Sequence, residues 1–398
     1  MSYLEKLLNG VEVEWKPLAH KEYGVAELSR GRVMSKEYLA DNAGEYPVYS
    51  SQTANNGEIG KIKTFDHDGE AVTWTTDGAN AGTVFHRTGK FSITNVCGLI
   101  KVKNIEELNY KFLFYWLSIE AKKHVYSGMG NPKLMSNQMA KIPIPIPPLS
   151  VQKEIVRILD SFTELTAELT AELTAELTAR KKQYNYYREK LLSFEERDVE
   201  WKPLGEVCDF QNGFAFQSNL FKDSGLPIVR ITNINGVNVD LSDVKYFSPD
   251  DYNSGNPLNY AIVKGDILIA MSGATTGKIG YYNLDEKAYL NQRVGKFIPN
   301  KELLNNRFLF HFLLTKNEFL YVLAGGGAQP NLSSNAIKEK LLIPIPPLSE
   351  QERIVAILDK FDVLTTSISE GLPREIELRK KQYEYYRDLL LTFPKNNI

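Results

Sequence analysis

The chain has 398 residues, of which 43% are hydrophobic and 24% charged, a composition typical of two well-packed domains with connecting elements. It contains no run of about 18 apolar residues and begins without a basic segment that leads into an apolar one, so we expect neither a membrane span nor a secretory signal. The net charge is −2, so a nucleic-acid partner would require the basic residues to be gathered on one face. The two cysteines, Cys97 and Cys208, are far apart, which predicts buried thiols in a reducing cytoplasm.

Repeated text shows that the chain is an internal duplication. Three segments return in the same order: VEWKPL at 13–18 and 199–204, IPIPPLS at 144–150 and 343–349, and RKKQYNYYR at 180–188, which becomes RKKQYEYYR at 379–387. The spacing from IPIPPLS to RKKQY is equal in both copies, whereas the text between VEWKPL and IPIPPLS has diverged almost completely. A shared frame therefore carries two different inserts. The predicted boundaries are a first domain at 1–148, a helical spacer at 149–197, a second domain at 198–347 and a second spacer at 348–398.

Each insert has the pattern of a mixed α/β (α+β) domain. Short β-branched runs are separated by Gly, Asn and Asp, which predicts strands and turns. The runs are AVTWTT, GTVFH and CGLIKV in the first copy, and PIVRITNI, DILIAM and KIGYY in the second. A helical patch follows in each copy, at roughly 109–123 and 305–323.

Each spacer begins with clustered prolines, then Ser150 or Ser349 with a Gln two residues on, and then helical spacing of apolar residues, which predicts a helix capped by the serine. The first spacer repeats TAEL over 166–177, and its leucines form a stripe that drifts by about 40° per repeat: Leu165, Leu169, Leu173 and Leu177. Such a stripe requires a partner helix. The second spacer is the expected antiparallel partner, with a break near Gly371 and Pro373; a coiled coil that dimerises the chain is the alternative.

Two related domains that alternate with two antiparallel helices form a body with pseudo-twofold symmetry. The symmetry of such a body matches that of a ligand with an approximate twofold axis and two separated binding sites. Duplex DNA is the commonest ligand of this kind.

The order of domain, IPIPPLSxQ helix, TAEL repeat and RKKQYxYYR, given twice, resembles the DNA specificity subunit of type I restriction–modification enzymes over essentially the whole chain. GFAF at 213–216, PIVRITNI at 227–234 and GDILIAMSG at 265–273 also look like patterns of that family. The resemblance implies two target-recognition domains that each read half of a bipartite double-stranded DNA target. It also implies spacers that dock two methyltransferase subunits, which restriction subunits join. S-adenosylmethionine, ATP and magnesium are then expected in those partners, with no cofactor or metal in this chain.

Base edges are read by Arg, Lys, Asn and Gln, with help from Ser and Thr. Candidate residues lie in the loops SRGR and 50–63, in the matched small-residue segments 75–82 and 272–277, and in the Gly-rich segments before each spacer; ordinary exposed turns are the alternative reading of these loops. The predicted DNA contacts are Arg30, Arg32, Gln52, Asn55, Asn56, Lys61, Lys63, Thr76, Asn80, Lys133, Arg230, Asn233, Thr275, Thr276, Lys278, Gln292, Arg293 and Asn331.

The RKKQYxYYR motif combines basic and aromatic residues, which suits either phosphates or a protein partner. Because the same text stands beside two unlike domains, we favour a repeated partner surface, and Tyr and Arg are residues that protein interfaces prefer. The predicted interface consists of Arg180, Lys181, Tyr184, Tyr187, Arg379, Lys380, Tyr383 and Tyr386.

The sequence contains no recognisable catalytic motif. GATTGK at 273–278 has the wrong spacing for a phosphate-binding loop, EWK at 14–16 lacks the preceding Asp of a nuclease site, GMGNPK at 128–133 lacks the spacing of a methyltransferase pocket, and the five histidines have no metal-ligand spacing. We therefore predict a non-catalytic DNA-binding subunit. The alternatives are a helical scaffold that displays two ligand-binding domains, which would show no DNA specificity, and a nuclease that cuts with magnesium alone.

Overall fold

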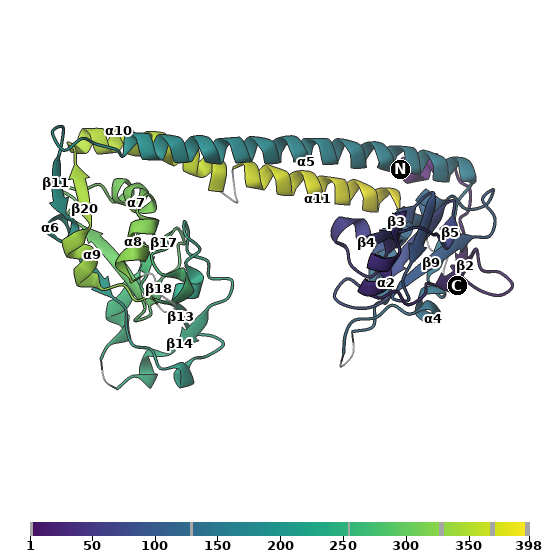
Figure 1. The fold of residues 1–398 in the computed structure, drawn as a ribbon, viewed down its shortest axis with the longest axis horizontal. Helices are drawn as coiled ribbons and strands as arrows, with labels where there is room; N and C mark the ends of the chain where they lie inside the picture. The colour runs from purple at the N-terminus through teal and green to yellow at the C-terminus, as the bar shows by residue number, and fades with distance from the viewer. Residues whose placement is uncertain (1–2, 128–129, 254, 326–329, 367–370, 395–398) are drawn as a thin grey trace. The chain divides into compact units, whose positions relative to one another are not determined.

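The computed structural model describes residues 3–127, 130–253, 255–325, 330–366 and 371–394, and the chain divides into two compact units. Unit 1 comprises 1–172 and 376–398, and unit 2 comprises 173–375. Each unit therefore contains one of the two inserts together with helical segments of both spacers (Figure 1). No helix of the described ranges has the length and apolar character needed to cross a lipid bilayer.

Unit 1 contains a two-stranded ribbon and two four-stranded sheets. The ribbon pairs β1 (Glu14–Pro17) with β10 (Pro143–Ile146), so VEWKPL and IPIPPLS are the two strands that open and close the domain. One sheet has the order β2 (Ala26–Arg30), β9 (Cys97–Val102), β6 (Ala71–Thr75) and β7 (Val84–Arg87), all antiparallel. The other has the order β4 (Glu58–Ile62), β3 (Ala43–Tyr49), β8 (Lys90–Ile93) and β5 (His67–Asp68), with β3 and β8 parallel.

Unit 2 repeats this topology strand for strand. Its ribbon pairs β11 (Glu200–Pro203) with β20 (Leu342–Ile345). Its sheets have the orders β12 (Cys208–Asn212), β19 (Val294–Pro299), β16 (Ile267–Ala270), β17 (Ile279–Tyr281), and β14 (Lys245–Phe247), β13 (Leu226–Val229), β18 (Ala288–Leu290), β15 (Ala261–Ile262). The single parallel pair, β13 with β18, corresponds to β3 with β8. The mixed α/β duplication predicted from the frame is confirmed, and it extends through the inserts whose text has diverged.

Short helices complete the two domains. In unit 1 they are α1 (Tyr3–Leu8), α2 (Lys36–Asp41), α3 (Tyr110–Glu120) and α4 (Ser136–Met139), and in unit 2 they are α6 (Leu204–Val207), α7 (Asn306–Leu314), α8 (Asn317–Leu323) and α9 (Ser334–Lys340). Single 3-10 turns are η1 (Ala54–Gly57), η2 (Ala121–His124), η3 (Ser218–Leu220), η4 (Ile231–Asn233), η5 (Pro249–Asp251), η6 (Pro257–Tyr260) and η7 (Gly273–Thr275). The second predicted helical patch is split into α7 and α8 at Thr315 and Lys316, because Lys316 departs from helical dihedral angles, with φ −106° and ψ 9°.

The apolar helices α3 and α7 occupy equivalent places in the two cores. Asn109 caps α3 by accepting from the amide of Phe112, and Asn305 caps α7 by accepting from Arg307 and Phe308. The helices bury Phe112, Leu113 and Leu117 in unit 1, and Phe308, Leu309, Phe312 and Leu313 in unit 2. Burial of these aromatic and aliphatic side chains is the main stabilising contribution of each core.

A buried glutamine joins each domain to its spacer helix. The amide of Gln152 accepts from Asn109 N at 2.9 Å and donates to the carbonyls of Glu107 and Pro147, both at 2.8 Å. Gln351 repeats all three bonds with Asn305 N (2.8 Å), Leu303 O (2.9 Å) and Pro346 O (2.8 Å). Both side chains are fully buried, so these bonds satisfy groups that water cannot reach.

The spacer helices begin two residues earlier than caps at Ser150 and Ser349 would place them. The first spacer is α5 (Leu149–Leu191), and the second is α10 (Leu348–Thr366) followed by α11 (Leu372–Leu390). Ser150 and Ser349 therefore lie within the first turn and do not cap it, since the prolines before Leu149 and Leu348 already end the preceding strand. The predicted interruption near Gly371 and Pro373 is confirmed by the separation of α10 from α11.

Within each unit α5 packs against one helix of the second spacer, and the two run in opposite directions (Figure 1). In unit 1, Thr163 of α5 bonds the Tyr383 hydroxyl of α11 at 3.0 Å. In unit 2, Tyr184 and Tyr187 of α5 stack on Phe361 of α10. The TAEL stripe is covered only in part: Leu165 is 52% exposed, contrary to expectation, while Leu169, Leu173 and Leu177 are half-buried.

The ends of the two spacers close the two cores in equivalent ways. Phe393 packs edge-on against Phe112 and Trp116 in unit 1, with ring centroids 5.9 and 6.1 Å apart. Phe194 packs against Phe308 in unit 2, with centroids 6.5 Å apart. The tail of the first spacer therefore belongs to unit 2, and the tail of the second spacer belongs to unit 1.

We predict that Phe393→Ala lowers the stability of unit 1 by about 3 kcal/mol, because it removes a buried ring and leaves a cavity. Hydrogen exchange resolved by peptide would show faster exchange in the strands of unit 1 and unchanged exchange in unit 2. Tyr385→Ala, in the same spacer at a ring that is 64% exposed, is the matched control and should change neither. Equal effects of the two variants would contradict the packing role of Phe393.

Candidate nucleic-acid interface

Five loops of unit 1 meet at one end of its two sheets. They follow the ends of β2, β3, β6 and β8 or precede α4, and comprise residues 30–33, 50–57, 76–82, 94–96 and 131–134. Hydrogen bonds join these loops directly. Arg30 donates to Asn95 O at 2.8 and 3.0 Å and to Thr76 Oγ1 at 3.1 Å. Thr94 Oγ1 donates to Ser50 Oγ at 2.9 Å, and Leu134 N donates to Thr76 O at 2.9 Å. We call this surface the five-loop face of unit 1.

Unit 2 has an equivalent five-loop face, formed by residues 213–216, 230–238, 271–278, 291–293 and 330–333. Its bonds are Gln292 N to Phe214 O (2.7 Å), Asn291 N to Val229 O (3.0 Å), Met271 N to Arg293 O (2.8 Å), Leu332 N to Met271 O (2.7 Å) and Thr275 Oγ1 to Ile231 O (3.2 Å). Predicted contacts that are more than 60 residues apart in the sequence are thus brought together in each unit.

Most of the predicted DNA contacts lie on these two faces with exposed amide or basic side chains. On unit 1 the exposed members are Arg32, Gln52, Asn55, Asn56, Asn80 and Lys133, and on unit 2 they are Lys278, Gln292, Arg293 and Asn331. Arg30, Arg230 and Thr275 are half-buried on the same faces. These are the side chains that hydrogen-bond base edges and phosphates.

Three predicted contacts are instead part of the framework. Thr76 is buried and donates to the carbonyl of Val96 at 2.9 Å, and Thr276 is buried and donates to Gly273 O at 2.7 Å. Asn233 is 4% exposed and donates to the carbonyls of Asp240 and Asp243, both at 2.9 Å. Their side-chain hydrogen-bonding groups are occupied and shielded, so in this structure these residues hold the loops, and their contact with DNA stays a prediction.

Two further predicted contacts lie away from the face. β4 runs from the face toward the opposite end of the sheet, with Lys61 opposite Pro47 and Ile62 opposite Ala43. Lys63 then bonds the carbonyl of Asn42, beyond the start of β3. The structure therefore does not bring Lys61 and Lys63 to the loops, because the strand that carries them leads away.

The small-residue segments match in backbone as well as in text. Gly82 and Gly277 both have positive φ, 79° and 82°, and both lie against the segment that follows α3 or α7. A Cβ on Gly82 would come within 2.9 Å of Val125 Cγ2, and one on Gly277 within 3.3 Å of Leu320 Cβ. Both the turn and this close approach require glycine.

The loop after β3 is held by a residue that sequence reasoning missed. Arg87 is 3% exposed, stacks on Tyr49 at 3.6 Å from the ring centroid and donates to Asn56 O at 2.8 Å. Burial lowers the pKa of its guanidinium. Asn55 and Asn56 both adopt left-handed conformations, which a loop keeps only when its surroundings impose them. The sequence signal was an arginine at the end of a short strand that begins with Val84 and Phe85.

The RKKQYxYYR motifs divide into packing and exposed residues. Tyr184 is 5% exposed and Tyr187 half-buried, so Tyr184 is a packing residue and not part of an exposed partner surface. Arg180 pairs with Glu176 at 2.7 Å within α5. Tyr386 contacts Phe162 and Tyr383 bonds Thr163, while Arg379 bonds Gln382. Lys181 and Lys380, at equivalent positions, are exposed.

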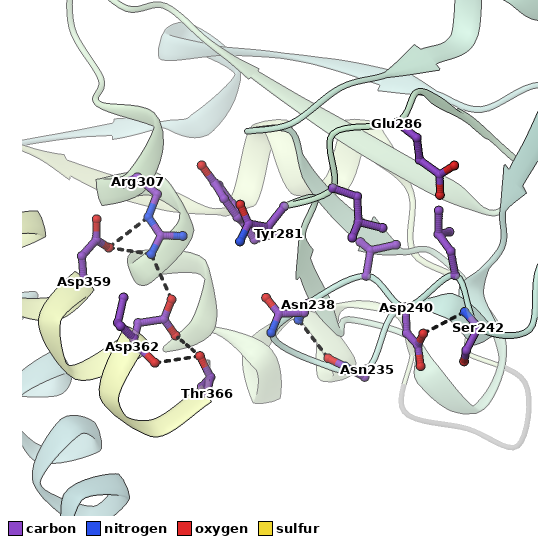
Figure 2. A pocket seen from close by; sticks show the side chains of 15 residues that line it. Asn235, Asn238, Asp240, Ser242, Tyr281, Glu286, Arg307, Asp359, Asp362 and Thr366 are labelled. Carbon is purple, nitrogen blue, oxygen red and sulfur yellow. Dashed lines mark hydrogen bonds and ion pairs between the residues drawn. The ribbon is translucent and has the colours of Figure 1, made fainter. Parts of the chain in front are cut away.

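A polar cleft of about 970 Å³ lies in unit 2 between α10 and the domain (Figure 2). Arg307 crosses one wall and bonds Asp359 at 2.5 Å and Asp362 at 3.0 Å, as Figure 2 shows. Asn235 and Asn238 line the other side. The charged groups on the Arg307 wall are paired with one another, so this wall has a structural role. Among the described residues no group of three or more His, Cys, Asp or Glu is placed to hold a metal ion.

The same network contains a buried histidine. His311 is fully buried, with Nε2 2.7 Å from Asp359 Oδ1 and Nδ1 3.1 Å from the Tyr184 hydroxyl. A neutral ring satisfies both neighbours by donating to Asp359 and accepting from Tyr184. In unit 1 the equivalent residue is Tyr115, whose hydroxyl donates to Asp160 at 2.8 Å.

Burial lowers the pKa of His311 below its ordinary 6.5, and this exceeds the opposite effect of the hydrogen bond to Asp359. The unfolded chain therefore gains this proton at a higher pH than the folded unit. We predict that unit 2 loses stability as pH falls from about 6.5 toward 5, by up to about 1.4 kcal/mol per pH unit for this one proton.

His311→Gln removes this titration while keeping an amide near Asp359, so its stability should depend less on pH in that window than the wild type. Peptide-resolved hydrogen exchange of unit 2 across the pH range, in the wild type and in the variant, measures the difference. Parallel pH profiles of wild type and variant would rule out the contribution of His311.

The two cysteines are buried free thiols, as the sequence predicted. Burial raises the pKa of Cys97 to about 11 and that of Cys208 to about 12. Thiols that stay protonated near neutral pH are poor nucleophiles and poor metal ligands.

Comparisons with known proteins agree with this geometry. The type I restriction modification DNA specificity domain matches the chain twice, at residues 12–179 and 196–378. The specificity subunit of an Escherichia coli type I restriction enzyme is 35% identical over 99% of this chain and 98% of that protein. A putative type I restriction enzyme specificity subunit of Haemophilus influenzae is 39% identical over 98% of each.

A chain from a solved structure concerned with complex assembly and conformational transition of the type I restriction–modification system has a similar fold. It matches with a TM-score of 0.61 at 17% identity, over 94% of this chain and 99% of that chain.

Proposed function

The chain belongs to the family of type I restriction–modification DNA specificity subunits, and we propose that it reads a bipartite duplex DNA target, one half with the five-loop face of each unit. The observation that carries this proposal is the strand-for-strand equivalence of two domains whose matched loops display different exposed side chains. Two domains with the same fold are suited to bind the same kind of ligand. Their different exposed side chains are suited to recognise different base sequences. Arg, Lys, Asn and Gln on both faces supply the hydrogen-bonding groups that major-groove readout uses.

In this proposal the chain directs the chemistry of partner subunits and performs none itself. Two methyltransferase subunits dock on the spacers, and restriction subunits complete the nuclease. Those partners hold S-adenosylmethionine, ATP and magnesium.

Matched exposed residues on the spacers support two equivalent docking sites. Tyr186 and Tyr385 occupy the same place in the repeated motif and are 57% and 64% exposed. Lys181 and Lys380 are matched and exposed in the same way. Exposed tyrosines beside basic residues are typical of protein interfaces, and the same surface given twice suits two copies of one partner.

Selection from a pool of randomised duplexes tests the proposal. The full-length chain, with the methyltransferase subunit of its system at moderate salt, should enrich two short conserved blocks separated by a gap of fixed length. A mutation on the face of one unit should affect only the block that this unit reads. Arg293→Ala should therefore weaken the sequence preference in one block only, and Asn80→Ala in the other block only. An intact complex that enriches no sequence would favour the alternative of a helical interaction scaffold.

The TAEL repeat gives a geometric prediction for the gap. One repeat adds about 6 Å of rise and about 40° of rotation to α5, whereas one base pair of DNA adds about 3.4 Å and about 35°. Deleting residues 174–177 should therefore shorten the preferred gap by one or two base pairs and leave both conserved blocks unchanged. The same selection measures it, and an unaltered gap in a folded variant would refute the proposed link between helix length and spacing.

A further inference from the structure

One short turn has the same backbone in both units. It joins β8 to β9 at residues 94–96 of unit 1, and β18 to β19 at residues 291–293 of unit 2. The turn is closed by the bond from Cys97 N to Thr94 O at 3.0 Å and by the bond from Val294 N to Asn291 O at 2.8 Å. We call these two segments the hub turns, because each bonds two other loops of its five-loop face and the last residue of the strand, β3 or β13, that leads into a third loop.

The contacts of the hub turns are equivalent bond for bond. In unit 1 they are Asn95 N to Arg32 O (3.1 Å), Thr94 N to Tyr49 O (2.9 Å) and Thr76 N to Val96 O (3.2 Å). In unit 2 they are Gln292 N to Phe214 O (2.7 Å), Asn291 N to Val229 O (3.0 Å) and Met271 N to Arg293 O (2.8 Å). Three backbone bonds to three separate segments fix the position of each turn within its face.

The side chains on this common backbone differ. Unit 1 presents Asn95, which is exposed, and Val96, which is half-buried, whereas unit 2 presents Gln292 and Arg293, both exposed. The backbone groups named above are engaged within the face, so variation at the turn lies in these side chains. Asn and Gln pair with adenine, Arg pairs with guanine, and an apolar side chain contacts the methyl group of thymine.

Two other pairs of loops contrast with the hub turns. The loop after β3 contains left-handed Asn55 and Asn56 and is held by Arg87, whereas its counterpart after β13 forms the 3-10 turn η4 and is held by Asn233. The segments 76–82 and 271–277 share a backbone, but each contains a buried threonine, Thr76 or Thr276. In the hub turns the two backbones match, and both central positions carry side chains that are accessible and differ between the units.

We propose that the hub turns are specificity-determining elements: Asn95 and Val96 in one unit, and Gln292 and Arg293 in the other, contact base edges and make the two halves of the target differ. This inference rests on the proposed function. It goes further by assigning the difference between the half-targets to two side chains on each matched turn, and by assigning a guanine contact to Arg293.

Exchanging the side chains between the turns tests the assignment. The double variant Asn95→Gln/Val96→Arg places the chemistry of unit 2 on the turn of unit 1, and the backbone should tolerate it because the two turns are bonded alike. Duplex selection with the full-length chain and its methyltransferase subunit should show one block that gains a guanine preference of about tenfold or more, with the other block unchanged. The reverse variant, Gln292→Asn/Arg293→Val, should lose a guanine preference in the other block only.

The matched control is Ile105→Arg, which adds an equal charge at a residue that is 63% exposed, beyond the far end of β9 from the hub turn. It should change neither block. Wild-type blocks in both exchange variants would overturn the inference while leaving the proposed function intact. Absence of any block with the wild-type chain would instead overturn the proposed function. If the first variant fails to fold, the reverse variant decides by the same criterion.

Discussion

A buried carboxamide must have its hydrogen bonds satisfied inside the protein, and this requirement determines how each domain meets its spacer. Gln152 and Gln351 each bridge the cap of an apolar helix, the loop before that helix and the proline segment that opens the spacer. Glutamate would place an ion where water is excluded, and leucine would leave one amide and two carbonyls unpaired. The direction in which α5 or α10 leaves its domain depends on these bonds.

The same junction explains why the frame is repeated in text while the inserts are not. The frame residues carry specific bonds and ring contacts in both units, such as Phe393 on Phe112 and Phe194 on Phe308. The inserts need only preserve strand order and turn geometry, which many sequences satisfy. A scaffold fixed at its base can therefore support loops of different chemistry, which is what two unlike half-targets require.

The spacers have a second role that their sequence conceals. Because the tail of the first spacer packs in unit 2 and that of the second packs in unit 1, each core is completed by residues from both spacers. The first tyrosine of each RKKQY motif serves this packing: Tyr184 reaches His311, and Tyr383 reaches Thr163. Repetition of the motif thus reflects two equivalent cores in addition to the proposed pair of partners, whose surface is left to exposed residues such as Tyr186 and Tyr385.

The sequence by itself determined the duplication, the mixed α/β class, the helical spacers and their break, because repeats, periodicity and proline clusters are local signals. It also placed most candidate contacts in loops that the fold brings together on the two five-loop faces, since polar residues between short strands lie where strands end. Only the tertiary structure decided which of them face outward. The side chains of Thr76, Thr276 and Asn233 donate to backbone carbonyls. Lys61 and Lys63 lie away from the face, because β4 runs toward the opposite end of the sheet. The importance of Arg87 and of the hub turns emerged in the same way. Their roles come from hydrogen bonds between segments far apart in the chain, which no local pattern encodes.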